Sequence, residues 1–125
     1  MEAIMHPILI VENDKSNRDL FAALLKMSGY ETVAVETAEQ ALDYMESHNP
    51  AAILLDILLP GMDGFTFTKI LRERTPSSQI PIIVVTARNT RPGDEPIIQQ
   101  GNYAAYFQKP VTADSIKKQL QMSLS

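Results

Sequence analysis

Cysteine is absent from the 125 residues of this chain, so neither a disulfide framework nor a metal site built on thiolates is possible. Long hydrophobic runs are absent too. The longest continuous apolar stretches have about five residues, far fewer than the roughly 20 that span a bilayer. The first residues do not follow the basic, apolar and small-residue order of a signal peptide. We therefore expect a protein of the reducing cytoplasm with no membrane segment.

Positive charge is also scarce. The chain carries 11 Lys and Arg against 15 Asp and Glu, which gives a formal net charge of -4, and it has no basic cluster. Nucleic-acid binding depends on concentrated Lys and Arg that neutralise phosphates, so we expect no direct contact with nucleic acid. An apolar content of 45% is that of an ordinary globular protein, and the length fits one domain over residues 1–125.

Three short aliphatic runs stand out along the chain, at residues 8–11, 51–55 and 82–85. They do not alternate with polar residues. Uninterrupted runs of this length are typical of strands that are covered on both faces, as in a parallel sheet. Residues 32–35 and 105–108 are two weaker strand candidates.

Helical patterns occupy the segments between these runs. Residues 16–28 fit a first helix, and Gly29 is suited to end it. Thr37 with Gln40 resembles a capping box that begins a second helix. The apolar residues predicted to share a face are Leu20, Phe21, Leu24 and Leu25 in the first helix, and Ala38, Ala41, Leu42 and Met45 in the second.

The three remaining helices have weaker patterns. A third is predicted around residues 67–74 and must end at Pro76. The fourth is predicted to be short, from about Asp94 to Gln100, because prolines and a glycine interrupt that region. The fifth is predicted to begin near Thr112 and to bury Ile116, Leu120 and Leu124. The third and fifth patterns rest on Phe67, Ile70, Leu71 and Arg74, and on Ile116, Leu120 and Leu124.

Strands and helices alternate five times in this interpretation. That order predicts a doubly wound α/β fold, an open parallel sheet with helices on both faces. Ligands of such sheets bind beyond the carboxyl ends of the strands. The residues at those ends are Glu12, Asn13 and Asp14 after the first strand, Asp56 after the third, Thr86 after the fourth and Lys109 after the fifth. We expect these acidic groups, the hydroxyl and the ammonium at one rim of the sheet.

This set of groups suits phosphoryl transfer to a carboxylate. A carboxylate can act as a nucleophile and form an aspartyl phosphate, provided that positive charge neutralises the incoming group. Mg²⁺ suits that role because it binds a few carboxylate or carbonyl oxygens and keeps its other waters. Lys109 supplies further positive charge and Thr86 a hydroxyl donor. Dinucleotide binding is disfavoured because no glycine-rich loop follows the first strand, and His6 and His48 lie outside the rim.

Four segments of the chain together resemble the receiver domains of response regulators, over essentially the whole length. They are Ile8–Asp14, Leu54–Gly64, Val84–Ala87 and Tyr106–Pro110. The resemblance implies a flavodoxin-like sheet of five parallel strands in the order 2-1-3-4-5. It also implies that a histidine kinase or phosphotransfer protein phosphorylates Asp56. A downstream protein would then bind the face formed by the fourth helix, the fifth strand and the fifth helix.

The resemblance assigns further roles to individual residues. Asp56 is the phosphoacceptor, and Thr86 and Lys109 contact the phosphoryl group. Thr86 and Tyr106 form the switch, in which Tyr106 swings inward on activation. The Lys109–Pro110 peptide is usually cis in the family. The Mg²⁺ ligands would be Glu12, Asn13, Asp56 and the backbone carbonyl of Leu58.

The chain departs from the family pattern in two places. The family has an acid at the position of Asn13, and an amide contributes no charge, so we expect weaker Mg²⁺ binding than usual. Asp14, next to it, is expected to cap the first helix. Residues 86–109 form a segment one residue longer than usual, and we place the extra residue near residues 90–92. Asn102 would then take a position often held by glycine, which the tolerance of asparagine for left-handed backbone permits.

Two alternatives remain open. Asn13 favours a pseudo-receiver, a binding module that signals without phosphorylation, although the retained phosphorylation set argues against it. The second alternative is a small phosphatase or other phosphotransferase that acts on an external substrate. A pair of Asp residues two apart would favour such an enzyme, but Ile57 and Leu58 follow Asp56. Asp63 is expected to be a turn or helix-capping residue.

Overall fold

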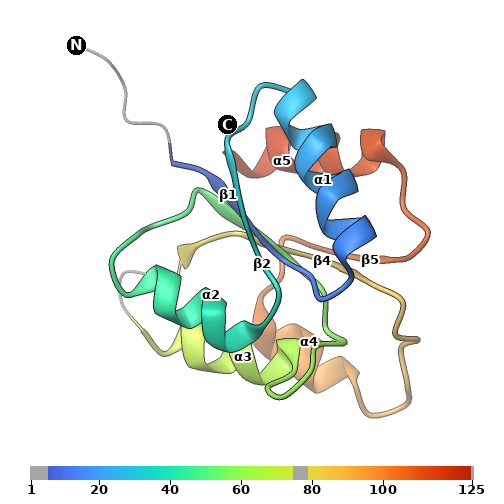
Figure 1. Cartoon of the computed structure of the whole chain (residues 1–125). Helices are drawn as coiled ribbons and strands as arrows, with labels where there is room; N and C mark the ends of the chain where they lie inside the picture. The colour runs from blue at the N-terminus through green and yellow to red at the C-terminus, as the bar shows by residue number, and fades with distance from the viewer. Residues whose placement is uncertain (1–5, 75–78, 125) are drawn as a thin grey trace.

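The computed structural model describes residues 6–74 and 79–124, in which five strands and five helices alternate (Figure 1). The strands are β1 (Ile8–Val11), β2 (Thr32–Val35), β3 (Ala52–Leu55), β4 (Ile82–Thr86) and β5 (Ala105–Gln108). The helices are α1 (Lys15–Met27), α2 (Ala38–Met45), α3 (Gly64–Arg72), α4 (Glu95–Gly101) and α5 (Ala113–Leu124). The predicted order of elements is confirmed. β3 begins one residue later than expected, and β4 extends to Thr86.

The strands form one parallel sheet in the order β2-β1-β3-β4-β5. β1 lies between β2 and β3, since Ile8 pairs with Thr32 on one side and with Ala52 on the other. This confirms the predicted doubly wound α/β fold and its strand order. The direction of winding reverses between β1 and β3, so the crevice typical of such sheets lies beyond the carboxyl ends of these two strands.

Alternate residues of each strand face opposite layers of helices. Leu9 and Val11 of β1 belong to a core cluster with Phe67 of α3, whereas Ile8 and Ile10 belong to a second cluster with helices α1 and α5. Figure 1 shows α1 and α5 on one side of the sheet and α2, α3 and α4 on the other. Because both faces are covered, the strands need apolar residues at every position, which explains their uninterrupted aliphatic runs.

Side-chain caps begin the first three helices, and they confirm the predicted roles of Asp14, Thr37 and Asp63. Each cap accepts a hydrogen bond from a backbone amide: Asp14 from Asn17 (3.1 Å), Thr37 from Gln40 (3.1 Å) and Asp63 from Thr66 (2.8 Å). The Gln40 carboxamide accepts from the Glu36 amide, one residue before the cap. Gly29 follows α1 with a φ of 92°, a left-handed conformation that suits glycine.

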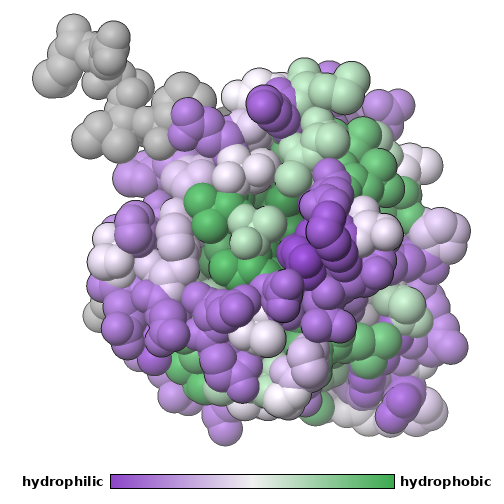
Figure 2. All heavy atoms as spheres, viewed as in Figure 1, coloured by the Kyte–Doolittle hydropathy of each residue, from purple (hydrophilic) through white to green (hydrophobic). Residues whose placement is uncertain are grey.

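Helix α1 buries a narrower stripe than its sequence pattern predicts. Phe21 and Leu25 are buried, but Leu20 is 53% exposed, so the prediction of one shared face is wrong for Leu20. Met27 at the end of the helix is 85% exposed. Only one edge of a helix laid on a flat sheet can touch the strands, and that edge holds residues about one turn apart. In Figure 2, apolar surface is visible where α1 lies, next to polar side chains.

Helices α3 and α5 also differ from prediction at their ends. α3 ends at Arg72 rather than near Pro76, because its last turn tightens before the expected stop. Pro76 itself lies outside the described residues. In α5, Ile116 and Leu120 are buried as predicted, but Leu124 in the last turn is 38% exposed. The prediction that Leu124 is buried is therefore wrong.

The segment from β4 to β5 matches its predictions more closely. α4 is short, with Asp94 as the residue before its first turn. Asn102 has a φ of 50°, so the expected left-handed asparagine is confirmed, and the Lys109–Pro110 peptide is cis. Throughout residues 6–74 and 79–124, no helix has the length and apolar character needed to cross a membrane.

Candidate functional site

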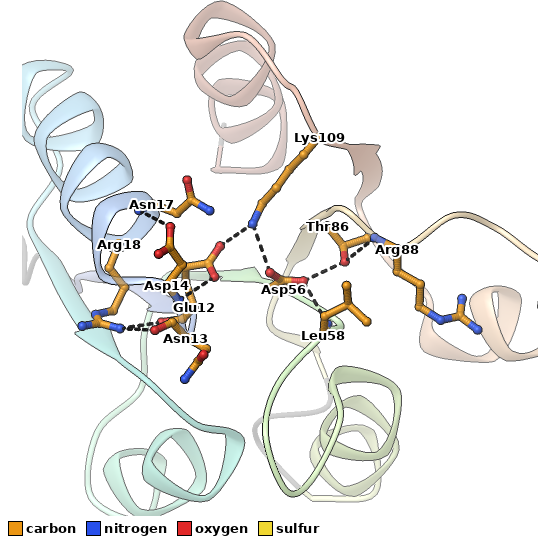
Figure 3. Close-up of polar contacts among 10 residues, drawn as sticks. All are labelled: Glu12, Asn13, Asp14, Asn17, Arg18, Asp56, Leu58, Thr86, Arg88 and Lys109. Carbon is orange, nitrogen blue, oxygen red and sulfur yellow. Dashed lines mark hydrogen bonds and ion pairs between the residues drawn. The ribbon is translucent and has the colours of Figure 1, made fainter.

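Four side chains from four strand ends meet at one rim of the sheet (Figure 3). Glu12 follows β1, Asp56 follows β3, Thr86 ends β4, and Lys109 follows β5. Because the strands are parallel, their carboxyl ends lie at the same edge, and the order 1-3-4-5 makes these ends neighbours. Glu12 and Asp56 are only 3% and 6% exposed. Two carboxylates are therefore held together out of water at the predicted place.

Asp56 accepts hydrogen bonds on both carboxylate oxygens. Its Oδ1 accepts from the Leu58 backbone amide at 2.9 Å and from the Thr86 hydroxyl at 2.7 Å. Its Oδ2 accepts from Lys109 Nζ at 3.1 Å. The three donors come from the loop after β3 and from the ends of β4 and β5. Such donors fix the orientation of the carboxylate.

Lys109 bridges the two buried carboxylates. Its Nζ lies 2.6 Å from Glu12 Oε1 and 3.1 Å from Asp56 Oδ2, as Figure 3 shows. Burial lowers the pKa of Lys109, but its bonds to the two carboxylates outweigh burial, so the net pKa is raised. Burial raises the pKa of the Glu12 carboxyl, against the opposing hydrogen bond from Lys109. One cation between two carboxylates leaves this cluster with an excess negative charge when both are ionised.

The loop between β1 and α1 is held by Arg18. Its guanidinium donates to the backbone carbonyls of Glu12 at 3.0 Å and Asn13 at 2.8 Å, and it also pairs with Glu36 at 3.3 Å. Glu12 Oε2 in turn accepts from the Asp14 backbone amide at 3.1 Å. These contacts fix the backbone around Asn13. The Asn13 side chain is exposed, and its amide has no hydrogen-bond partner among residues 6–74 and 79–124.

The candidate metal ligands form an all-oxygen set, which fits Mg²⁺. They are the carboxylates of Glu12 and Asp56, the Asn13 amide oxygen and the Leu58 carbonyl. Across the described part of the chain, no three His, Cys, Asp or Glu side chains are grouped closely enough to hold a metal ion. Asp14 does not provide a third acidic ligand, because its carboxylate caps α1 by accepting a hydrogen bond from the Asn17 amide. The set therefore fits Mg²⁺ with fewer charges than a site built from three acids would have.

A second group of polar contacts lies beside Thr86. The Thr86 hydroxyl, which donates to Asp56, also accepts from the Arg88 backbone amide at 3.2 Å. The Arg88 guanidinium forms two hydrogen bonds with the buried carboxylate of Asp94, at 2.7 and 3.2 Å. The phosphoacceptor candidate is thus connected, through Thr86, to the loop that leads into α4.

Tyr106 lies on β5 with its ring partly buried. The ring packs edge-on against Tyr103, with centroids 6.0 Å apart. In the part of the chain that the structure describes, its hydroxyl is a buried polar atom without a hydrogen-bond partner. Burial raises the pKa of Tyr106, whereas the nearby charge of Arg88 acts to lower it. A buried hydroxyl without a partner is uncommon and calls for an explanation.

The predicted site residues Glu12, Asp56, Thr86 and Lys109 are in direct contact with one another through hydrogen bonds. Sequence reasoning missed three other residues, which are Arg18, Arg88 and Asp94. The only signal in the sequence is that Arg88 closely follows Thr86. Nothing in the residue pattern pairs it with Asp94 or directs Arg18 to the carbonyls of the β1–α1 loop.

Comparison with known proteins decides the family. Residues 8–121 match the response regulator receiver domain. The chain belongs to this family. The match covers every strand and the four strand ends that form the rim, so the strand-end cluster lies in the region that family members share. The chain is thus a receiver domain of two-component signalling.

Individual relatives agree with this assignment. The receiver domain is 41% identical over 105 residues to the polar-differentiation response regulator DivK of Brucella ovis, covering 84% of this chain and 85% of that protein. It is 30% identical to the receiver domain of a sensor histidine kinase from Pseudomonas aeruginosa, with a TM-score of 0.85 and coverage of 97% and 98%. That structure contains a magnesium ion coordinated in the active site cleft. The chemotaxis protein CheY4 of Vibrio cholerae matches with a TM-score of 0.87 at 26% identity, covering 97% and 100%.

Proposed function

We propose that this receiver domain accepts a phosphoryl group on Asp56 from a histidine kinase or a histidine phosphotransfer protein. The observation that carries the proposal is the environment of Asp56. It is a nearly buried carboxylate at a strand end, and a lysine, a threonine and a backbone amide donate to its oxygens. Helix capping is the ordinary use of an acid beside the start of a helix, and Asp56 caps no helix. Asp14 and Asp63 already cap the adjacent helices.

The proposed reaction transfers phosphorus from nitrogen to oxygen. An Asp56 carboxylate oxygen attacks the phosphorus of a phosphohistidine, the P–N bond breaks, and the imidazole leaves with the bonding electron pair and takes up a proton. Charge develops on the phosphoryl oxygens during transfer. Lys109 and Thr86 already face Asp56 as cation and hydroxyl donor, so they would stabilise that charge from positions close to those in the structure.

Mg²⁺ is the proposed cofactor. Glu12, Asn13, Asp56 and the Leu58 carbonyl would hold it, and when bound it supplies neutralising positive charge beside the phosphoryl group. The neutral Asn13 in place of an acid should make binding weaker than is usual in the family. Support for a metal in this cleft comes from the donor set and from the magnesium in the related kinase receiver domain.

The proposed output is a change of protein binding. Movement of Thr86 and Tyr106 after phosphorylation would alter the face formed by α4, β5 and α5, to which a downstream protein would bind.

We further propose that residues 1–125 form one receiver domain, that it acts in the cytoplasm with its kinase, and that neither nucleic acid nor membrane is its direct partner.

The rival proposal is a pseudo-receiver that binds partners without phosphorylation. Asn13 is the observation in its favour, because replacement of an acidic metal ligand by a neutral amide is a first step toward loss of the reaction. The complete set of Asp56, Thr86 and Lys109 argues for phosphorylation. A Mg²⁺ titration separates the two, since a pseudo-receiver has no need to bind the ion.

A phosphotransfer assay tests the function itself. A histidine phosphotransfer protein carrying phosphohistidine is mixed with the domain and Mg²⁺, and phosphate on each protein is followed with time. We expect Mg²⁺-dependent transfer to the wild-type domain and loss of transfer in Lys109→Ala, because a positive charge beside the phosphoryl oxygens is removed. Lys118→Ala on the exposed face of α5 is the matched control. Equal transfer to Lys109→Ala would show that the role of Lys109 is wrong.

A further inference from the structure

The loop between β4 and α4 is closed by one buried carboxylate. Asp94 is 7% exposed, and it accepts two hydrogen bonds from the Arg88 guanidinium, at 2.7 and 3.2 Å. It accepts a third from the Arg91 backbone amide at 2.7 Å. These bonds tie the beginning of the loop to its end. Charge-assisted, bidentate contacts of this kind are among the strongest and most directional in proteins.

Asp94 makes these bonds instead of capping its own helix. It stands directly before α4, where an aspartate ordinarily accepts from the first free amides, yet its side chain makes no such bond. The Arg88 guanidinium is further fixed because it lies over the ring of Phe65 in α3, with its central carbon 5.1 Å from the ring centroid. Arg88 and Asp94 therefore join the loop, α3 and α4 into one unit.

The same loop determines where the Thr86 hydroxyl points. The Arg88 amide donates to Thr86 Oγ1 at 3.2 Å, and this places the hydroxyl so that it donates to Asp56 Oδ1 at 2.7 Å. A threonine that donates to the free carboxylate must turn or shift before it can donate to a phosphoryl group attached there. Any such movement disturbs the bond from Arg88, and through it the pair with Asp94.

Tyr106 lies beside the same pair of side chains. Its buried hydroxyl has no hydrogen-bond partner within residues 6–74 and 79–124, although the charges of Arg88 and Asp94 both act on it. The Arg88 guanidinium thus lies close enough to act on the Tyr106 hydroxyl, while its two closest hydrogen bonds go to Asp94. A rearranged loop would have a donor and an acceptor to offer this hydroxyl.

We propose that Arg88 and Asp94 are positioning residues for Thr86, a pair that holds the β4–α4 loop so that the Thr86 hydroxyl stays on the unphosphorylated carboxylate. The pair restrains phosphorylation at Asp56 and must loosen when Thr86 turns to the phosphoryl group. This inference rests on the proposed phosphorylation of Asp56. It adds the residues that set how readily this particular chain changes conformation.

Amide hydrogen exchange of the unphosphorylated protein tests the restraint. Asp94→Asn keeps the size of the side chain but removes its charge, and we expect residues 87–101 to exchange about fivefold faster or more, because a charge-assisted pair is lost. Residues of β1 and α1 should be unaffected. Glu95→Gln is the matched control, since it removes an acid from the next position without touching Arg88. Equal exchange in Asp94→Asn and wild type would overturn the proposal.

The rate of phosphorylation by acetyl phosphate with Mg²⁺ tests the link to Thr86, a readout that a purely structural role would not raise. Asp94→Asn and Arg88→Gln should each be phosphorylated severalfold faster than wild type, and the double variant no faster than either, because both changes break the same pair. Additive effects or slower phosphorylation would overturn the positioning role. Failure of the wild type to be phosphorylated at all would instead overturn the proposed function together with this role.

Discussion

Asn13 stands where the resemblance to receiver domains leads us to expect an acid, and its surroundings suggest a consequence for metal binding. The backbone at this position is fixed by Arg18, which holds the carbonyls of Glu12 and Asn13. Its amide oxygen can bind a cation but contributes no charge. The two remaining carboxylates already share the ammonium of Lys109. We therefore expect both the neutral amide and the shared ammonium to weaken the attraction of the site for a divalent cation.

Replacement of this amide by a carboxylate tests the argument. Asn13→Asp should bind Mg²⁺ more tightly by about 1 kcal/mol, one unit-charge interaction at short range in a hydrated site. Without metal, the variant should unfold at a slightly lower temperature, because a third carboxylate joins Glu12 and Asp56. The measurement is a Mg²⁺ titration with a thermal melt of both proteins. Asn49→Asp, in the loop before β3 at the opposite end of the sheet, is the control. Equal affinity of Asn13→Asp and wild type would refute this account of the acidic pocket.

Tyr103 gives a prediction of pH dependence that does not involve the phosphorylation site. Its hydroxyl donates to Thr68 Oγ1 at 2.8 Å, and burial raises its pKa from 10.0 to about 12. In this range the unfolded chain ionises first, so the stabilisation is complete below pH 10 and is lost as the pH rises toward 12. Tyr103→Phe should lose about 1 kcal/mol at neutral pH but show a shallower alkaline decline. Urea unfolding from neutral to alkaline pH measures the free energy of unfolding and its decline with pH. A decline as steep in Tyr103→Phe as in wild type would contradict the prediction.

At the scale of the elements, the strands could be predicted from sequence more accurately than the helices. A run such as residues 82–85 is buried on both faces, so composition alone reveals it. A helix contacts the sheet along only one edge. Apolar residues beside that edge, such as Leu20, fit the same sequence pattern but stay exposed. The early end of α3 at Arg72 could not be predicted either, because its last turn tightens before Pro76, where the Glu73 amide donates to the Ile70 carbonyl.

The turn from β3 into α3 offers a prediction about packing of elements. A Cβ added to Gly64 would lie 2.7 Å from Ile57 Cα and 2.8 Å from the Asp56 carbonyl oxygen. These are backbone atoms that cannot move aside without displacing the site. Gly64→Ala should therefore destabilise the protein by about 1–3 kcal/mol, although alanine is the better helix former. Gly29→Ala, at a positive φ but in open space, isolates the backbone contribution. Urea unfolding gives the free energy of unfolding of the two variants and of wild type. A Gly64→Ala variant more stable than wild type would disprove this packing argument.

For the whole molecule, the fold explains why residues far apart in the sequence could be predicted to meet. Five alternations of strand and helix require a parallel sheet, and a parallel sheet gathers Glu12, Asp56, Thr86 and Lys109 at one rim. The sequence predicted these members of the site for that reason. It could not predict the Arg88–Asp94 pair, because two residues within one irregular loop obey no period. Loop contacts depend on a backbone path that only the structure gives.

The measurement that tests the central claim most directly is intact mass after incubation with acetyl phosphate and Mg²⁺. The domain as a whole must bring the nucleophile, the metal ligands and the cation together for any adduct to form. We expect the wild-type protein to gain the mass of one phosphoryl group, and Asp56→Asn, a nearly isosteric replacement at the acceptor, to gain none. An equal adduct on Asp56→Asn, or no adduct on a folded wild-type protein with Mg²⁺ in excess, would contradict the assignment of Asp56 as the phosphoacceptor.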